Sequence, residues 1–151
     1  MPVPSTIQFR GNIYGKRVFR PSANLPQGGA GALFTITGGP ILVGGIFGRV
    51  TTILGAVANA GKLVSNPTVG ADQDLCATVE LNAKPVGTML TITGLFTDAL
   101  IAAGAAASGP VRPVVVSAGT IDLNCVGSTT GQIQWTMFWV PLASGVIVSA
   151  A

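Results

Sequence analysis

Few residues in this chain can do acid–base, metal or nucleophilic chemistry. Its 151 residues include five acids, two cysteines and no histidine, so the usual general base and the commonest metal ligand are missing. Asp72 and Asp74 are the only close pair of acids, and they supply too few oxygens for a calcium loop without help from elsewhere. The sequence therefore predicts no catalytic residue, no metal and no cofactor. It indicates a protein that is not an enzyme and has no small-molecule substrate.

The two cysteines, Cys76 and Cys125, stand in similar contexts, each shortly after an Asp-Leu pair. Neither has a neighbouring base that would mark it as a nucleophile, and two cysteines do not make a disulfide framework. The start of the chain lacks the basic and apolar regions of a signal peptide, and no stretch offers about 18 consecutive apolar residues. We therefore expect cytoplasmic synthesis, no membrane span and free, buried thiols, with pairing of the two cysteines left open.

The basic residues gather near the start of the chain. Residues 1–71 carry six basic residues and no acid, whereas residues 72–151 carry two basic residues against five acids, a balance of −3. Four of the eight basic residues fall between positions 10 and 20, with aromatic residues among them. The candidate partner-binding residues are these basic side chains and their aromatic neighbours: Arg10, Lys16, Arg17, Arg20, Phe9, Tyr14 and Phe19.

Such a basic stretch suits several partners. It can dock on an acidic protein surface, on nucleic acid or on the acidic half of another copy, or it can be a solvated terminus. Basic residues interleaved with aromatic ones are compatible with single-stranded nucleic acid. The rest of the chain lacks a sustained basic stripe, so nucleic acid is the disfavoured partner.

We expect residues 1–31 to form an extended basic arm and residues 32–151 a single β-rich domain. Four prolines disfavour regular structure in the arm, and residues 27–31 form a Gly-rich flexible joint. The arm also contains Ile7, Ile13 and Val18, which with its aromatic residues make it too apolar for a free tail. We therefore expect the arm to lie against its own domain or against a neighbouring subunit.

The composition indicates an all-β protein. Only 9% of the residues are charged, while Gly contributes 21 residues and Pro 10, which suggests a protein that hides part of its surface against partners. Eight to ten short strands between turn signals predict an antiparallel sandwich, a jelly roll or a barrel. An Ala-rich stretch at residues 98–107, with Thr97 or Asp98 as its N-cap, is the one predicted helix.

Residues 131–142 hold both tryptophans and predict the main core strand. Side chains alternate along a strand, and we assign the odd positions to the core: Ile133, Trp135, Met137 and Trp139. The alternative is a ligand-stacking platform made by the two tryptophans. The opposite face begins polar and turns apolar at Phe138 and Val140, where a partner could cover it.

Residues 74–82 show the cleanest alternation in the chain and predict a half-exposed strand. Leu75, Val79 and Leu81, together with Ala77, are predicted to face the core. Asp74, Cys76 and the other even positions are predicted to face solvent.

Several stretches are similar to small virion proteins of tailed bacteriophages. The similar residues are 62–77 (KLVSNPTVGADQDLCA), 86–94 (VGTMLTITG), 119–123 (GTIDL) and 131–142 (GQIQWTMFWVPL), within a region of about residues 33–145 that leaves the arm outside. The resemblance implies a capsid decoration (cement) protein, made in the host cytoplasm and located in the virion capsid. The implied partners are the major capsid protein and other copies of the chain, often as trimers in proteins of this kind. This family has no catalytic residues to transfer.

Two other functions stay open at the level of the sequence. A tail or head–tail joining protein would form rings or tubes. A host-surface or carbohydrate-binding module would use Trp135 and Trp139 as its stacking rings. An extended arm and a weakly charged β-body favour the cement protein, because both add permanent contact area between subunits.

Overall fold

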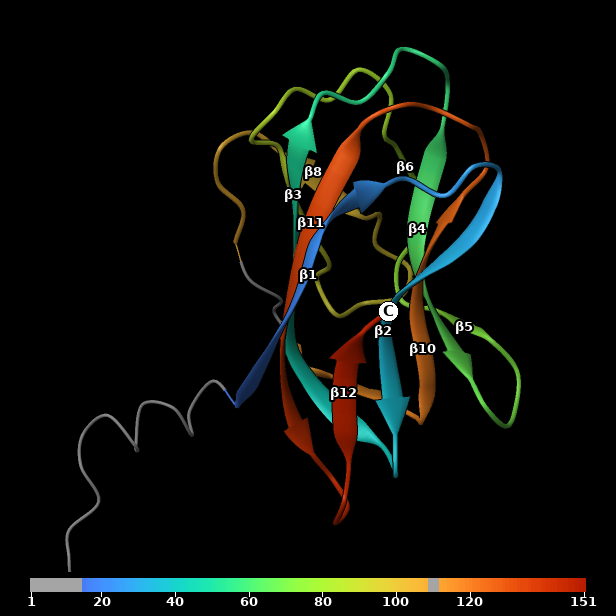
Figure 1. Cartoon of the computed structure of the whole chain (residues 1–151), viewed down its shortest axis with the longest axis vertical. Coiled ribbons are helices and arrows are strands. Elements are labelled where there is room, and N and C mark those ends of the chain that lie inside the picture. The colour runs from blue at the N-terminus through green and yellow to red at the C-terminus, as the bar shows by residue number, and fades with distance from the viewer. Residues whose placement is uncertain (1–14, 109–111) are drawn as a thin grey trace, which may run out of the picture.

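The computed structural model describes residues 15–108 and 112–151. These residues form two six-stranded sheets that pack face to face as a β-sandwich, seen as two layers in Figure 1. The strands within each sheet pair antiparallel, and the described residues contain no α-helix. The predicted all-β class and antiparallel sandwich are therefore confirmed.

Sheet A contains the Trp-rich strand next to one of its edge strands. Its strands follow the order β1-β11-β3-β7-β8, and β9 pairs with another part of β3. The bounds of its strands are β1 Lys16–Asn24, β11 Gln132–Pro141, β3 Ile41–Thr52, β7 Met89–Thr91, β8 Ile101–Ala103 and β9 Val114–Val116.

Sheet B forms the second layer. Its strands follow the order β12-β2-β10-β4-β5, and β6 pairs with another part of β4. The bounds of its strands are β12 Ile147–Ala150, β2 Gly29–Thr37, β10 Gly119–Cys125, β4 Ala60–Pro67, β5 Gln73–Asp74 and β6 Val79–Glu80.

The core lies between the two sheets and is built from their facing side chains. From Gln132 to Trp139 in β11 the odd positions are buried and the even positions are partly exposed, which is the pattern expected when alternate residues point into a sandwich. The buried residues of β11 are Ile133, Trp135, Met137 and Trp139. Phe34, Ile36, Leu63 and Ile121 face them from sheet B as part of the same core cluster.

The predicted helix at residues 98–107 is wrong. The stretch turns after Leu95 and then forms β8, while Leu100 is buried in the core. The backbone of Ala77 donates a hydrogen bond to Asp98 O (2.7 Å) and accepts one from Leu100 N–H (2.9 Å), so this backbone is used in a bridge between segments. Pairing between distant segments outweighs the weak helical preference of alanine.

The continuous strand predicted for residues 74–82 is also wrong. The stretch forms only the short strands β5 and β6, each pairing with a different part of β4. Leu75 and Leu81 are buried and Val79 packs against the core, as the alternation predicts. Ala77 is exposed, however, and Cys76 is buried, because the chain bends between the two short strands.

The sheets begin earlier in the chain than the predicted domain boundary at residue 31. Residues 16–24 form β1, which pairs along β11, and β2 starts at Gly29. The second half of the predicted arm therefore belongs to the β-body. Residues 1–14 lie outside the described residues.

Candidate interaction surface

The predicted partner-binding residues are divided by the structure. Phe9, Arg10 and Tyr14 lie outside the described residues. The other four lie on β1, and the alternation of the strand sends them to opposite sides of sheet A. Because directly paired residues share a face, the pairs Arg17–Phe138 and Phe19–Thr136 point away from sheet B.

Lys16 and Arg20 point toward the inner side of β1. The Lys16 Nζ lies 5.2 Å from the centroid of the Trp139 ring, a cation–π contact that covers the end of the core. The Nε of Arg20 donates a hydrogen bond to the backbone oxygen of Ala151 at 3.2 Å, which links β1 to the end of β12. Partial burial lowers the pKa of Arg20 from its ordinary value, but a guanidinium stays charged at neutral pH.

We call the surface of sheet A that points away from sheet B the outer face. Its first row crosses three strands and has a phenylalanine at each end, since Phe19 pairs with Thr136 and Thr136 pairs with Phe47. Its second row is formed by Val140, Leu42 and Val115, which also pair directly across three strands.

The two rows are joined by a pair of aromatic rings. The rings of Phe47 and Phe138 contact edge to face, with centroids 6.5 Å apart and planes at 72°. Gly45 pairs with Phe138 and leaves room for the Phe47 ring, because a Cβ at Gly45 would be only 2.8 Å from Phe47 Cε2. The middle of the outer face is therefore a packed aromatic cluster.

This apolar surface is substantially exposed. Phe19 is 47% exposed, Val140 38% and Val115 62%, while Leu42, Phe47 and Phe138 are partly exposed. Sequence reasoning identified Phe19, Phe138 and Val140 but missed Leu42, Phe47 and Val115. Alternation with buried neighbours could have marked these residues as facing outward, but their places on the outer face depend on the strand order.

The charge of the outer face is basic. Arg17 and Arg49 are exposed on it, and the strands of sheet A contain no acidic residue. Sheet B contains Asp74, Glu80 and Asp122 on its strands, with Lys62 as its one basic residue. The charge asymmetry of the sequence thus becomes an asymmetry between the two layers of the sandwich.

The two tryptophans are core residues. Trp135 is 1% exposed and Trp139 5%, so the two rings do not form an exposed platform for stacking a sugar. The ring of Trp135 lies across Gly48 of β3, where a Cβ would be 2.8 Å from its Cζ3 atom. The proposed Trp platform for a carbohydrate is therefore not present in this structure.

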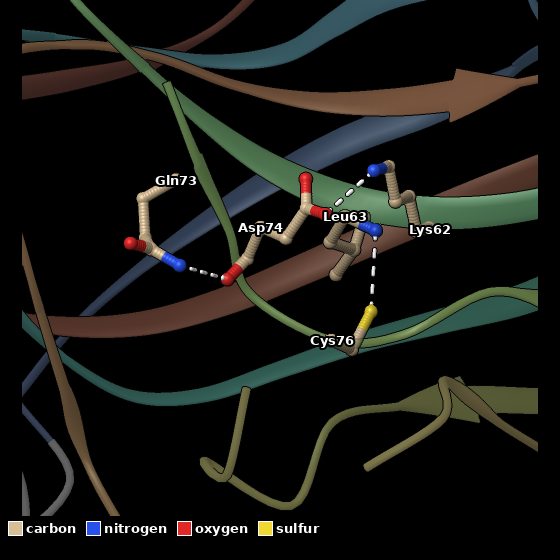
Figure 2. Close-up of polar contacts among 5 residues, drawn as sticks. All are labelled: Lys62, Leu63, Gln73, Asp74 and Cys76. Carbon is tan, nitrogen blue, oxygen red and sulfur yellow. Dashed lines mark hydrogen bonds and ion pairs between the residues drawn. The ribbon is translucent and has the colours of Figure 1, made fainter. Parts of the chain in front are cut away.

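The two residues of β5, Gln73 and Asp74, make local polar contacts. The Lys62 Nζ lies 2.6 Å from Asp74 Oδ2, and Gln73 Nε2 donates to the Asp74 carbonyl at 2.9 Å (Figure 2). The ion pair is partly exposed to water, so it contributes little to stability. No group of three or more Cys, Asp or Glu side chains suited to a metal occurs in the described part of the chain.

Both cysteines are free and buried. Burial raises the pKa of the Cys76 thiol, whose Sγ accepts a hydrogen bond from the Leu63 N–H at 3.3 Å (Figure 2). Burial raises the pKa of the Cys125 thiol to about 11. Both thiols are therefore protonated at neutral pH, a state in which cysteine is a poor nucleophile.

No helix long and apolar enough to cross a membrane occurs in residues 15–108 and 112–151.

The feature that stands out is the apolar, basic outer face of sheet A. Comparisons of the chain with protein-family models, curated proteins and solved structures give no match.

Proposed function

We propose that this chain is a structural protein of a tailed-phage virion, a capsid decoration (cement) protein that binds the major capsid protein and other copies of itself. The observation that carries the proposal is the outer face of sheet A. It presents exposed Phe19, Val115 and Val140 around an aromatic cluster, with Arg17 and Arg49 on the same face.

The composition of this face fits a permanent protein contact. Aromatic residues and arginine are enriched at protein interfaces, whereas most other charged residues are depleted at their centres. A free sheet face with this much apolar surface is unfavourable in water, because burying apolar area contributes about 25 cal/mol per Å². A standard interface buries about 800 Å² per partner, so a face of this kind can supply the centre of one.

The sequence stretches that resemble virion proteins are a second, separate support for the same role. In the fold they supply β11 and β7 of sheet A, and β5 with most of β4 and β10 in sheet B. They therefore contribute strands to both sheets of the sandwich. The proposed action is mechanical: the body bridges neighbouring capsid subunits, and the added buried area resists the pressure of packaged DNA.

Co-sedimentation with capsid shells of the phage that encodes the chain tests this function. Val115→Asp places a carboxylate on the exposed outer face, and we expect it to weaken binding to the shells by at least roughly tenfold. Ile147→Asp is the matched control, because Ile147 is 64% exposed on β12 of sheet B. It should bind like the unchanged protein, and both variants should keep the normal melting temperature.

Two outcomes would count against the proposal. Binding that is lost equally in both variants would remove the outer face as the contact surface. Purified protein that forms rings or tubes in electron micrographs and ignores capsid shells would instead indicate a tail or head–tail joining protein.

A further inference from the structure

Strand β1 leaves one edge of sheet A open. It pairs with β11 along one side, and no other strand of the described residues pairs with its other side. Its nearest neighbour in sheet B, β12, is linked to it by the hydrogen bond between Arg20 and Ala151. An open edge carries unpaired backbone N–H and C=O groups, which can pair with an extended strand from another chain.

A β-bulge in β1 opens a pocket at this edge. Arg20 pairs with Trp135 and Ala23 with Ile133, so Pro21 and Ser22 together oppose the single residue Gln134. Beside the bulge lies a pocket of about 120 Å³, which we call the edge pocket. Its lining is mainly apolar and includes Arg20, Ala23, Leu25, Pro26, Ile133 and Trp135.

The size and chemistry of the edge pocket suit one apolar side chain. An apolar cavity of about 150 Å³ in a protein core holds a benzene ring, and the edge pocket is of comparable size. Arg20 is the one charged residue in its lining. An open strand edge next to a side-chain pocket is the arrangement by which added strands are recognised, through backbone pairing and alternate side chains.

Residues 7–13 have a sequence pattern that suits this edge. Ile7, Phe9 and Ile13 fall on odd positions, and the even positions between them are the polar Gln8, Arg10 and Asn12. A strand with this pattern directs its apolar side chains to one side and its polar side chains to the other. Phe9 is the aromatic residue of the three and the best match to the edge pocket.

The described structure begins at Gly15, which lies against β11 and not at the open edge of β1. Gly15 has a φ of +73°. A Cβ at Gly15 would overlap the carbonyl oxygen of Trp139 and lie 2.9 Å from Val140 Cγ2. The chain therefore runs close against β11, on the side of β1 opposite its open edge. A strand for that edge is better supplied by another copy.

We infer that residues 7–13 of one copy add as a strand to the open edge of β1 in a second copy, with Phe9 in the edge pocket. This inference rests on the proposed function and names how copies of the protein join each other. It concerns contacts between copies alone, so it can be tested without capsids. Such exchange of a terminal segment links subunits by backbone pairing and needs no new folded element.

Cross-linking of the full chain tests the inference directly. One protein carries Phe9→Cys, and a second carries Ala23→Cys or, nearer the start of β1, Arg20→Cys. Mixing the two under mild oxidation should give disulfide-linked dimers on a non-reducing gel, while neither protein alone should. The native thiols of Cys76 and Cys125 are buried and stay out of the reaction in folded protein.

The contradicting results are equally clear. No linked dimer with either acceptor position would overturn the inference. A protein carrying both Phe9→Cys and Ala23→Cys that gives only linked monomers would show that the segment docks on its own chain, which also overturns it.

Association of the unlinked protein gives a second readout. Phe9→Ser should weaken self-association roughly tenfold or more in sedimentation velocity, because the pocket then loses an aromatic side chain. Gln8→Ser alters the opposite side of the same strand and should change association less than about twofold. Equal effects of the two changes would argue against an apolar anchor. If Phe9→Ser does not weaken self-association while the unchanged protein still binds capsid shells, the inference fails and the proposed function stands.

Discussion

At the scale of single residues, Gly48 decides how the largest core side chain packs. Gly48 pairs with Trp135 of the neighbouring strand, and a Cβ at Gly48 would lie only 2.8 Å from the indole ring. The two residues are far apart in the sequence, so only the register of β3 against β11 reveals the contact. The alternation of β11 predicts that Trp135 is buried, but it does not predict which residue makes room for the ring.

This contact gives a stability prediction. Gly48→Ala forces the buried Trp135 ring to move, and we expect it to lower the free energy of unfolding by about 1–3 kcal/mol, as overpacking of a core does. Gly44→Ala is the control, because Gly44 is exposed and the nearest atom to its Cβ would be Phe138 O at 3.8 Å. Chemical denaturation of both variants measures the difference. Equal stability of the two would show that the ring has room to shift.

At the scale of elements, β11 is the strand that the sequence describes best. Its inner positions are all apolar and its outer positions begin polar, so burial imposes an alternation that can be read directly. The structure adds that β11 is paired on both sides, with β1 and with β3. Every backbone N–H of its central residues therefore faces a paired strand.

Proline substitutions test this position in the sheet. Thr136 pairs with both Phe19 and Phe47, so Thr136→Pro removes a ladder hydrogen bond and leaves a carbonyl unpaired. We expect the free energy of unfolding to fall by about 1–3 kcal/mol or more. Ala150→Pro in the edge strand β12 should lower the free energy of unfolding less, because the Ala150 N–H points away from β2. This follows from the neighbouring Ala151 N–H, which donates to Leu33 O. Similar losses in both variants would contradict the central position of β11.

The elements that were predicted wrongly share a physical cause. The Ala-rich stretch at residues 98–107 has a weak local preference for helix, but Leu100 is buried and its N–H is bonded to Ala77. Pro21 by itself predicts a break in regular structure, yet it lies in the bulge of an edge strand, where proline is tolerated. In each case pairing with a distant segment overrides the local signal, and a local pattern cannot show that pairing.

At the scale of the whole molecule, the sandwich sorts the charges of the chain into two layers. The sequence shows that basic residues come early and acidic residues late, and the fold turns this into a basic sheet A and a mainly acidic sheet B. The outer face itself could be predicted only in part. Phe138 and Val140 stand out in one strand, but Leu42 and Val115 join them through strand order, which no local pattern encodes.

The sorting of charge predicts which charge reversal affects capsid binding. Arg17→Glu and Lys84→Glu change the net charge equally, but only Arg17 lies on the outer face; Lys84 lies between β6 and β7. If an acidic surface docks there, Arg17→Glu weakens binding to capsid shells and reduces its dependence on salt, since close charge pairs dominate such contacts. Lys84→Glu should shift binding much less, because charges beyond about 10 Å are screened at 0.1 M salt. Sedimentation at low and high salt separates the two. Equal loss in both variants would mean that net charge alone, and not the outer face, governs the association.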